Sequence, residues 1–94
     1  MSPRIAKIRD AIQETEKCQA AHFASAPIRE MFGNKVAWEG VVECFDLKGH
    51  PKAKRAYGWT YKDDQEDQFV IVLEIPPVDS AQTAVRVAIA SAAK

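Results

Sequence analysis

The sequence has no excess of charge of either sign, because thirteen Lys and Arg residues balance thirteen Asp and Glu residues. Proteins that bind nucleic acids usually carry a basic excess, since neutralising phosphate groups supplies much of their affinity. Binding of a nucleic acid would therefore depend on a local basic cluster, and the composition argues against a nucleic-acid partner.

Long apolar runs and cysteines are also scarce. No stretch approaches the roughly 18 apolar residues that a membrane helix needs. An amphipathic pattern starts directly after Met1-Ser2-Pro3-Arg4, so we expect no secretory signal. Cys18 and Cys44 could form one disulfide, but without such a signal we expect both to be reduced. The sequence predicts a cytoplasmic protein with no membrane partner.

Motifs of catalysis are missing as well. The chain has neither a phosphate-binding glycine loop nor a nucleophile elbow. Cys18 and His22 have a helical spacing that can hold a metal, but two ligands do not make a zinc site. Glu39 and Glu43 lie roughly 13 Å apart on one strand face, too far for paired catalytic carboxylates, and we expect both to face solvent. The sequence predicts no catalytic residue, metal or cofactor and favours a non-enzymatic protein.

The composition that remains is that of one small folded domain. Of 94 residues, 47% are apolar and 28% are charged, which is typical of a globular protein rather than a disordered one. A chain of this length is too short for two independent cores and buries roughly 60–68% of its unfolded surface. We expect a single domain over residues 1–94, to which oligomerisation would add stability.

A helix is predicted at each end of the chain. Residues 3–22 repeat apolar side chains at a spacing of three and four, after a serine cap and a proline at the first helical position. The second helix is expected over residues 81–93, with Asp79 or Ser80 as its cap. Its inner face is rich in alanine, which favours close approach to a sheet or another helix.

Runs with a period of two lie between the helices and predict β-strands. They cover residues 35–45, 56–61 and 69–75. Residues 25–34 form either a short helix ending at Gly33 or an edge strand closed by a Gly33-Asn34 turn, and we favour the hairpin. The acidic residues 63–67 would connect the last two strands.

The resulting fold class is α+β with the order α-β-β-β-β-α. We expect an antiparallel sheet of three to four strands that carries both helices on one face. The other face would mix apolar and charged side chains, which is more typical of an interface than of free surface. The apolar residues expected on this second face are Val41, Phe45, Val70 and Val72. They predict a homodimer formed through this face or through an edge strand.

A histidine lies in the segment before the aromatic strand. His50 could act as a general base or contact a ligand, because imidazole titrates near neutral pH. We favour a structural role instead, in which it packs and hydrogen-bonds in a turn set by Gly49 and Pro51, because Asp46 is the only close carboxylate in sequence. With His50 at its mouth, a pocket between sheet and helices would be lined by Trp38, Tyr57, Trp59 and Tyr61.

Basic residues adjoin the same aromatic strand. Lys52, Lys54 and Arg55 precede its three rings, a pairing found in proteins that bind single-stranded nucleic acids. The three rings share one strand face, however, and we favour core packing as the explanation for them.

Five segments together resemble a group of small bacterial proteins of unassigned activity. They are Trp38–Glu43, Phe45–Leu47, Gly49–Ala53, Tyr57–Trp59 and Pro76–Val78. The similarity spans about residues 25–90 and implies a bacterial cytoplasmic origin, with no catalytic residue or cofactor to transfer. The core order also resembles the double-stranded RNA-binding domain, but that family's lysine cluster is replaced here by Asp79-Ser80-Ala81-Gln82-Thr83.

The leading hypothesis is a non-enzymatic interaction module that forms a homodimer. A small-molecule pocket is the second hypothesis, and an RNA-binding domain or an enzyme that uses His50 follows.

Overall fold

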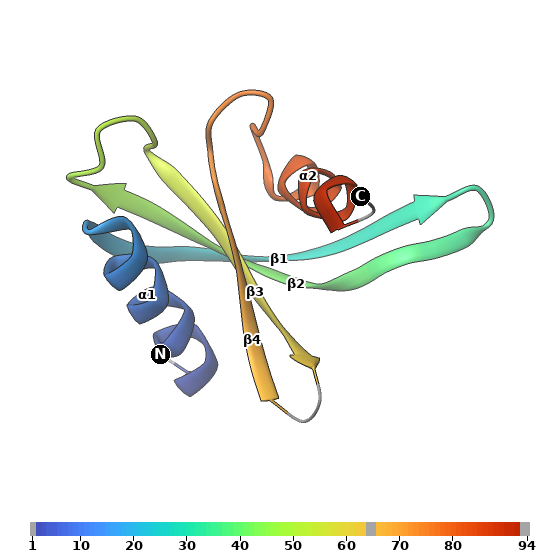
Figure 1. Ribbon diagram of the computed structural model, residues 1–94, viewed down its shortest axis with the longest axis horizontal. Helices are drawn as coiled ribbons and strands as arrows, with labels where there is room; N and C mark the ends of the chain where they lie inside the picture. Colours follow the sequence, from blue (N-terminus) through green and yellow to red (C-terminus); the bar gives the residue numbers. More distant parts are fainter. Residues whose placement is uncertain (1, 64–65, 93–94) are drawn as a thin grey trace.

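The computed structural model describes residues 2–63 and 66–92. Its elements are α1 (Pro3–Glu16), β1 (Gln19–Phe32), β2 (Lys35–Lys48), β3 (Arg55–Asp63), β4 (Glu66–Leu73) and α2 (Ala81–Ala92). The four strands form one antiparallel sheet in the order β1-β2-β3-β4 (Figure 1). The predicted α+β class and element order are confirmed. No described helix is both long and apolar enough to cross a membrane.

The strands are paired unevenly. β1 and β2 pair from Gln19 with Lys48 to Phe32 with Lys35, almost their whole length. In the described part of the chain, β2 and β3 pair only from Glu43 to Asp46 of β2. Residues 27–41 therefore project past β3 as a two-stranded extension, called the arm below, which runs to the right in Figure 1.

The hairpin favoured for residues 25–34 is confirmed, and the short helix is wrong. Phe32 ends β1, Gly33 and Asn34 make the turn, and Lys35 begins β2. Gly33 has a φ of 63°, which glycine adopts at no steric cost. Pro27 lies in β1, an edge strand, where a missing N–H donor is tolerated.

The first helix is shorter than the predicted span of residues 3–22. It ends at Glu16, and Lys17 adopts a left-handed φ of 54° that reverses the chain into β1. The Gln13 side chain then accepts a hydrogen bond from the N–H of Ala20 at 3.1 Å. Apolar residues continue past the helix because β1 also buries one of its faces, and apolar spacing alone could not separate the two elements.

The second helix begins where the sequence predicted. Ser80 is its cap, because its side-chain oxygen accepts the N–H of Thr83 at 3.2 Å while Thr83 Oγ1 accepts the N–H of Ser80 at 3.0 Å. This reciprocal pair satisfies two N–H groups at the start of the helix.

The two helices cover opposite faces of the sheet, so the prediction that they share one face is wrong. Successive residues of a strand point to opposite faces. Phe45 packs in a cluster with Ile8 and Ile12 of α1, whereas its neighbour Cys44 packs in a cluster with Val85 of α2. We call these sides the α1 face and the α2 face. Figure 1 shows the helices on either side of the β3–β4 hairpin.

The sequence contains a sign of this arrangement in β4. Residues 70–73 are four consecutive apolar residues, and a strand covered on both faces lacks the polar residues at every second position that a half-exposed strand has. Ile71 and Leu73 pack on the α1 side, and Val70 and Val72 on the α2 side. Two small cores therefore share one sheet.

Candidate functional site

An apolar concavity lies beside α2 on the α2 face. Its volume is about 310 Å³, at the lower end of the range of small-molecule sites. Its lining residues are Trp38, Trp59, Tyr61, Val70, Val85, Ala88 and Ile89. The rings of Trp38 and Trp59 form one wall, with centroids 5.5 Å apart and planes at 57°. None of the described lining residues carries a formal charge, so the concavity suits an apolar group.

Three of the four aromatic residues predicted to line a pocket do so. Tyr57 is the exception, because it is buried in the core and its hydroxyl donates a hydrogen bond to the carboxylate of Glu74. Burial, followed by the hydrogen bond to Glu74, raises the pKa of Tyr57 far above its usual value. Tyr57 is therefore a neutral core residue rather than a ligand contact.

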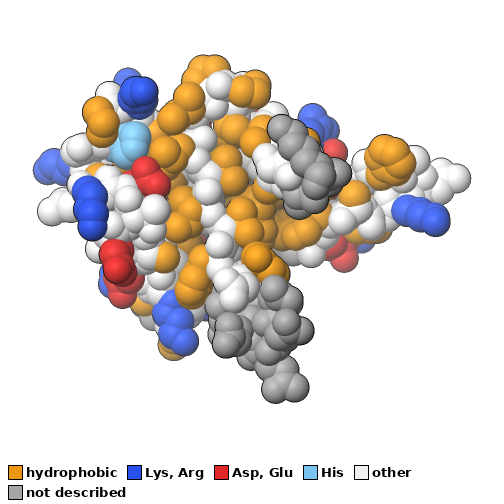
Figure 2. Space-filling model, in the orientation of Figure 1, with side chains coloured by type: hydrophobic (Ala, Val, Ile, Leu, Met, Phe, Trp, Pro, Cys, Tyr) orange, Lys and Arg blue, Asp and Glu red, His pale blue; other side chains and the backbone are white. Residues whose placement is uncertain are grey.

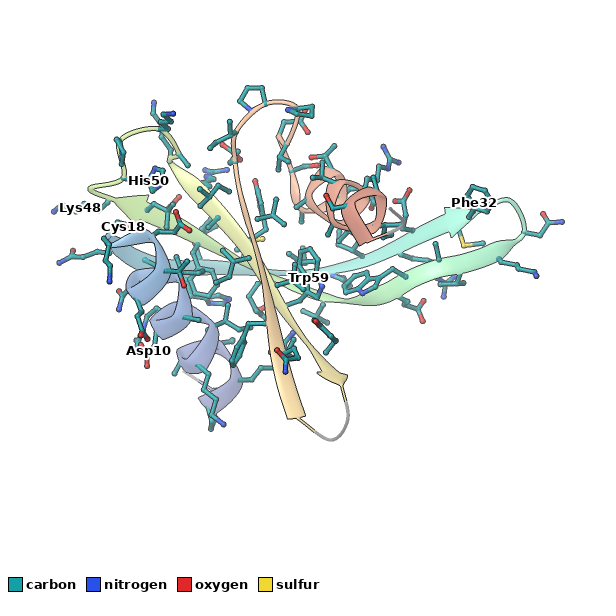
Figure 3. All side chains as sticks on the ribbon, in the orientation of Figure 1. Asp10, Cys18, Phe32, Lys48, His50 and Trp59 are labelled. Atoms are coloured by element: carbon teal, nitrogen blue, oxygen red, sulfur yellow. The ribbon has the colours of Figure 1, made fainter. Side chains whose placement is uncertain are left out.

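His50 does not lie at the mouth of this concavity, and that part of the prediction is wrong. It contacts Glu16 at the C-terminal end of α1, away from Trp59 (Figure 3). Its Nδ1 accepts the N–H groups of Lys52 at 3.0 Å and Ala53 at 2.9 Å. Nε2 must then carry the proton, and it donates to Glu16 at 3.3 Å. Both ring nitrogens fix the β2–β3 connection, which is the structural role considered for this histidine.

The basic residues near the aromatic strand do not form one surface with its rings. Lys52 and Lys54 are exposed in the β2–β3 connection, while Trp59 is buried. Arg55 lies over the ring of Phe23, 4.8 Å from its centroid, and its Nε donates to Asp46 at 3.2 Å. Stacking of nucleic-acid bases on the strand aromatics beside these cations is therefore not supported by the geometry.

The four residues expected on one apolar face are not brought together. Phe45 is fully buried against α1. Val70 and Val72 lie on the opposite face, because they pair with Trp59 and Tyr57, and both pack against the core there. Val41 is exposed, on the α1 side of the arm.

Exposed apolar side chains gather instead at the end of the arm. Phe32 is 82% exposed, Val36 50% and Met31 47%. Figure 3 labels Phe32 at the end of the arm, and Figure 2 shows a separate hydrophobic group there. The signal was present in the sequence, because Met31 and Phe32 directly precede the Gly33-Asn34 turn, where a solvated hairpin end would be polar.

A buried carboxylate is the second feature that sequence reasoning missed. Glu43 was expected to face solvent, but it is only 2% exposed, on the α1 face. Arg4 of α1 forms an ion pair with it, His22 Nε2 lies 2.9 Å from Oε1, and the Ser25 hydroxyl donates to the same oxygen. Arg4 also donates to Thr60 Oγ1 at 3.3 Å, and to the carbonyl of Val41 at 3.0 Å.

Serine, histidine and glutamate meet here, but not in the arrangement of a hydrolase. A catalytic triad places the serine on one imidazole nitrogen and the carboxylate on the other. In this cluster Nε2 of His22 faces both Glu43, at 2.9 Å, and Ser25, at 3.4 Å. The serine proton goes to the carboxylate. The cluster therefore clamps the N-terminal part of α1 onto the sheet rather than activating a nucleophile.

We call the cluster of Arg4, His22, Ser25 and Glu43 the clamp. It makes the stability of the folded protein depend on pH in the acid range. Burial acts to raise the pKa of Glu43, but hydrogen bonds from Ser25, His22 and Arg4 outweigh it and hold the pKa below its usual value. Such a carboxylate stabilises the folded state above its unfolded pKa, about 4.3 for Glu. This contribution is lost as the pH falls through the lower folded value. We expect the unfolding free energy to fall more steeply between a pH of about 4.3 and the lower folded pKa in the natural protein than in Glu43→Gln, as measured by urea titration. Parallel pH profiles would contradict this assignment.

The described residues offer few other groups that could bind a metal ion. They contain no group of three His, Cys, Asp or Glu side chains placed to hold a metal ion. Cys18 lies in the turn after α1 and His22 in β1, so the helical spacing considered for this pair does not exist. Comparison with protein-family models, curated proteins and solved structures finds no match to this chain.

Proposed function

We propose that this chain is a non-enzymatic interaction module that forms a homodimer through its arm. The observation that supports this proposal is the projection of the arm past β3, with the side chain of Phe32 82% exposed at its end. Burying a phenylalanine side chain contributes roughly 1.5–3 kcal/mol. A two-fold symmetric dimer would gain this contribution twice, because each contact occurs in both copies.

Strand edges and charge also favour association of two copies. Residues 35–40 of β2 lie outside the described ladder with β3 and before Val41, whose carbonyl is bonded to Arg4, so this stretch offers backbone groups to another strand. The chain has a formal net charge of zero, so two copies do not repel each other at long range. Exposed apolar side chains beside an open strand edge are typical of a contact surface.

We place this module in the bacterial cytoplasm. Cys18 and Cys44 are both free thiols. Burial, with smaller contributions from neighbouring charges, raises the pKa of both, so the reactive thiolate is disfavoured. Two unpaired and weakly reactive cysteines suit a reducing compartment.

A small-molecule site is the second candidate function. It is supported by the uncharged concavity of about 310 Å³, which three of the predicted aromatic residues line. An apolar or flat aromatic molecule would fit such a lining, because none of the described residues that line it compensates a charge on the ligand.

Native mass spectrometry over a dilution series tests the dimer. We expect a dimer of unmodified chains, and we expect Phe32→Ser to raise the dimer Kd at least tenfold, or about 1.4 kcal/mol. Phe69→Ser is the matched control, because Phe69 is 38% exposed in β4, away from the arm. A monomer at every concentration would contradict the proposal, and a monomer with added mass would favour the small-molecule site.

A further inference from the structure

Phe32 lies on the same side of the sheet as the concavity. In β1, Ala24, Ala26 and Ile28 pack in the α2 core. The register shifts after Glu30, but the extra residue there, Ala37, belongs to β2, so the alternate series of β1 continues through Glu30 to Phe32. Glu30 pairs with Trp38, a residue of the concavity. Phe32 is two residues further along, roughly 7 Å at the rise of a β-strand. One chain thus carries an apolar projection and an apolar hollow, close together on one face.

Cover by α2 stops just before Phe32. Arg86 of α2 pairs with Glu30 at 3.0 Å, and the Gln82 side chain donates to the carbonyl of Arg29 at 3.3 Å. Phe32 lies past these contacts and is 82% exposed. It is the exposed residue at the end of this β1 series, past the described contacts of α2.

We propose that Phe32 of each copy occupies the concavity of a second copy, so that two arms cross reciprocally about a two-fold axis. This inference rests on the proposed homodimer and names its contact. Because projection and hollow lie side by side on one face, a two-fold axis between them brings each Phe32 over the other copy's concavity. Both contacts then form at once, and the assembly closes as a dimer rather than growing into a filament.

The chemistry of the two surfaces agrees with this occupant. A phenyl ring fits within about 310 Å³ and would meet the rings of Trp38, Trp59 and Tyr61. Two charged residues near Phe32 already have partners, since Glu30 pairs with Arg86 and Arg29 with Glu39 at 2.5 Å, and the exposed Lys35 opposite Phe32 can keep its ammonium group in water. Docking would therefore not bury an unpaired charge from these residues, which would oppose association.

Two complementary variants test the contact. Phe32→Ala removes the projection, and Ala88→Phe fills the hollow from the α2 side without changing a residue of the arm. We expect each variant alone to show at least a tenfold higher dimer Kd in native mass spectrometry. Mixing the two should produce a heterodimer, because Phe32 of the Ala88→Phe chain can still enter the intact hollow of the Phe32→Ala chain. Circular dichroism checks that both variants fold, and Tyr61→Glu is the second hollow variant, since Tyr61 is already 48% exposed.

The outcomes separate this contact from the dimer itself. If the natural chain is a monomer, with or without a bound small molecule, both the dimer and the contact are overturned. If it is a dimer that Phe32→Ala weakens but Ala88→Phe and Tyr61→Glu do not, the dimer stands and insertion into the concavity is overturned. If neither kind of variant changes the Kd, the dimer uses another surface and the contact is again overturned. Formation of the heterodimer from the mixed variants supports the proposal.

Discussion

Replacing Phe45 with alanine is expected to lower the unfolding free energy by about 3–5 kcal/mol. Phe45 is among the largest fully buried side chains and joins Ile8 and Ile12 of α1 to Ala56 of β3. Truncation would open a cavity between helix and sheet that these neighbours fill only in part. Because domains have a total stability of roughly 5–15 kcal/mol, the variant should be largely unfolded in mild urea.

The matched control is Phe32→Ala, which makes the same truncation at an exposed phenylalanine. Its effect on the stability of the monomer should stay within about 0.5 kcal/mol, measured by urea unfolding at a concentration where the dimer dissociates. The sequence pattern placed Phe45 on an interface. A small loss of stability in Phe45→Ala together with a weakened dimer would restore that assignment.

The second large effect is expected for Arg4→Met, which should cost about 2–3 kcal/mol. Removing one partner of a buried ion pair costs roughly 3–5 kcal/mol, because the other charge remains buried without compensation. The value here should be lower because the Arg4 side chain is 38% exposed, although that of Glu43 is only 3% exposed. The Glu43 carboxylate would keep its contacts with His22 and Ser25 but lose the guanidinium group of Arg4.

Arg29→Met provides the comparison for this substitution. Arg29 pairs with Glu39, but the two side chains are 64% and 55% exposed, and exposed pairs contribute roughly 0–1 kcal/mol. The loss of unfolding free energy, measured by urea unfolding, should therefore be clearly larger for Arg4→Met than for Arg29→Met. Adding Glu43→Leu to Arg4→Met should recover part of the loss, because it removes the buried charge as well. Equal effects of Arg4→Met and Arg29→Met would contradict the clamp.

Local chemistry is what made parts of this fold predictable. The turn at Gly33 needs a positive φ and the start of α2 needs a hydroxyl cap, and both requirements are visible in neighbouring residues. The face of each β4 residue was not predictable in the same way. Residues 70–73 are all apolar, so no polar side chain marks which of the two strand faces is exposed. Only the pairing of Val70 with Trp59 decides which side each one takes.

The candidate site could likewise be predicted from the sequence only in part. Trp38, Trp59 and Tyr61 were grouped correctly because strand periodicity places them. The clamp was missed because Arg4, His22 and Ser25 lie 39, 21 and 18 residues from Glu43 in sequence. Nothing local marks a glutamate as buried when its partners come from another strand and a helix. His50 was misplaced for the same reason, since its partner Glu16 is 34 residues away.

The placement of the two helices has a consequence for cooperativity. The halves of the chain, α1-β1-β2 and β3-β4-α2, are joined in the sheet only by the short described β2–β3 ladder. Yet α1 also contacts β3 and β4, and α2 contacts β1 and β2. Each half thus supplies a helix that the other half needs, and a fragment containing one half would leave both cores incomplete. The chain should therefore unfold in a single transition although it has two cores.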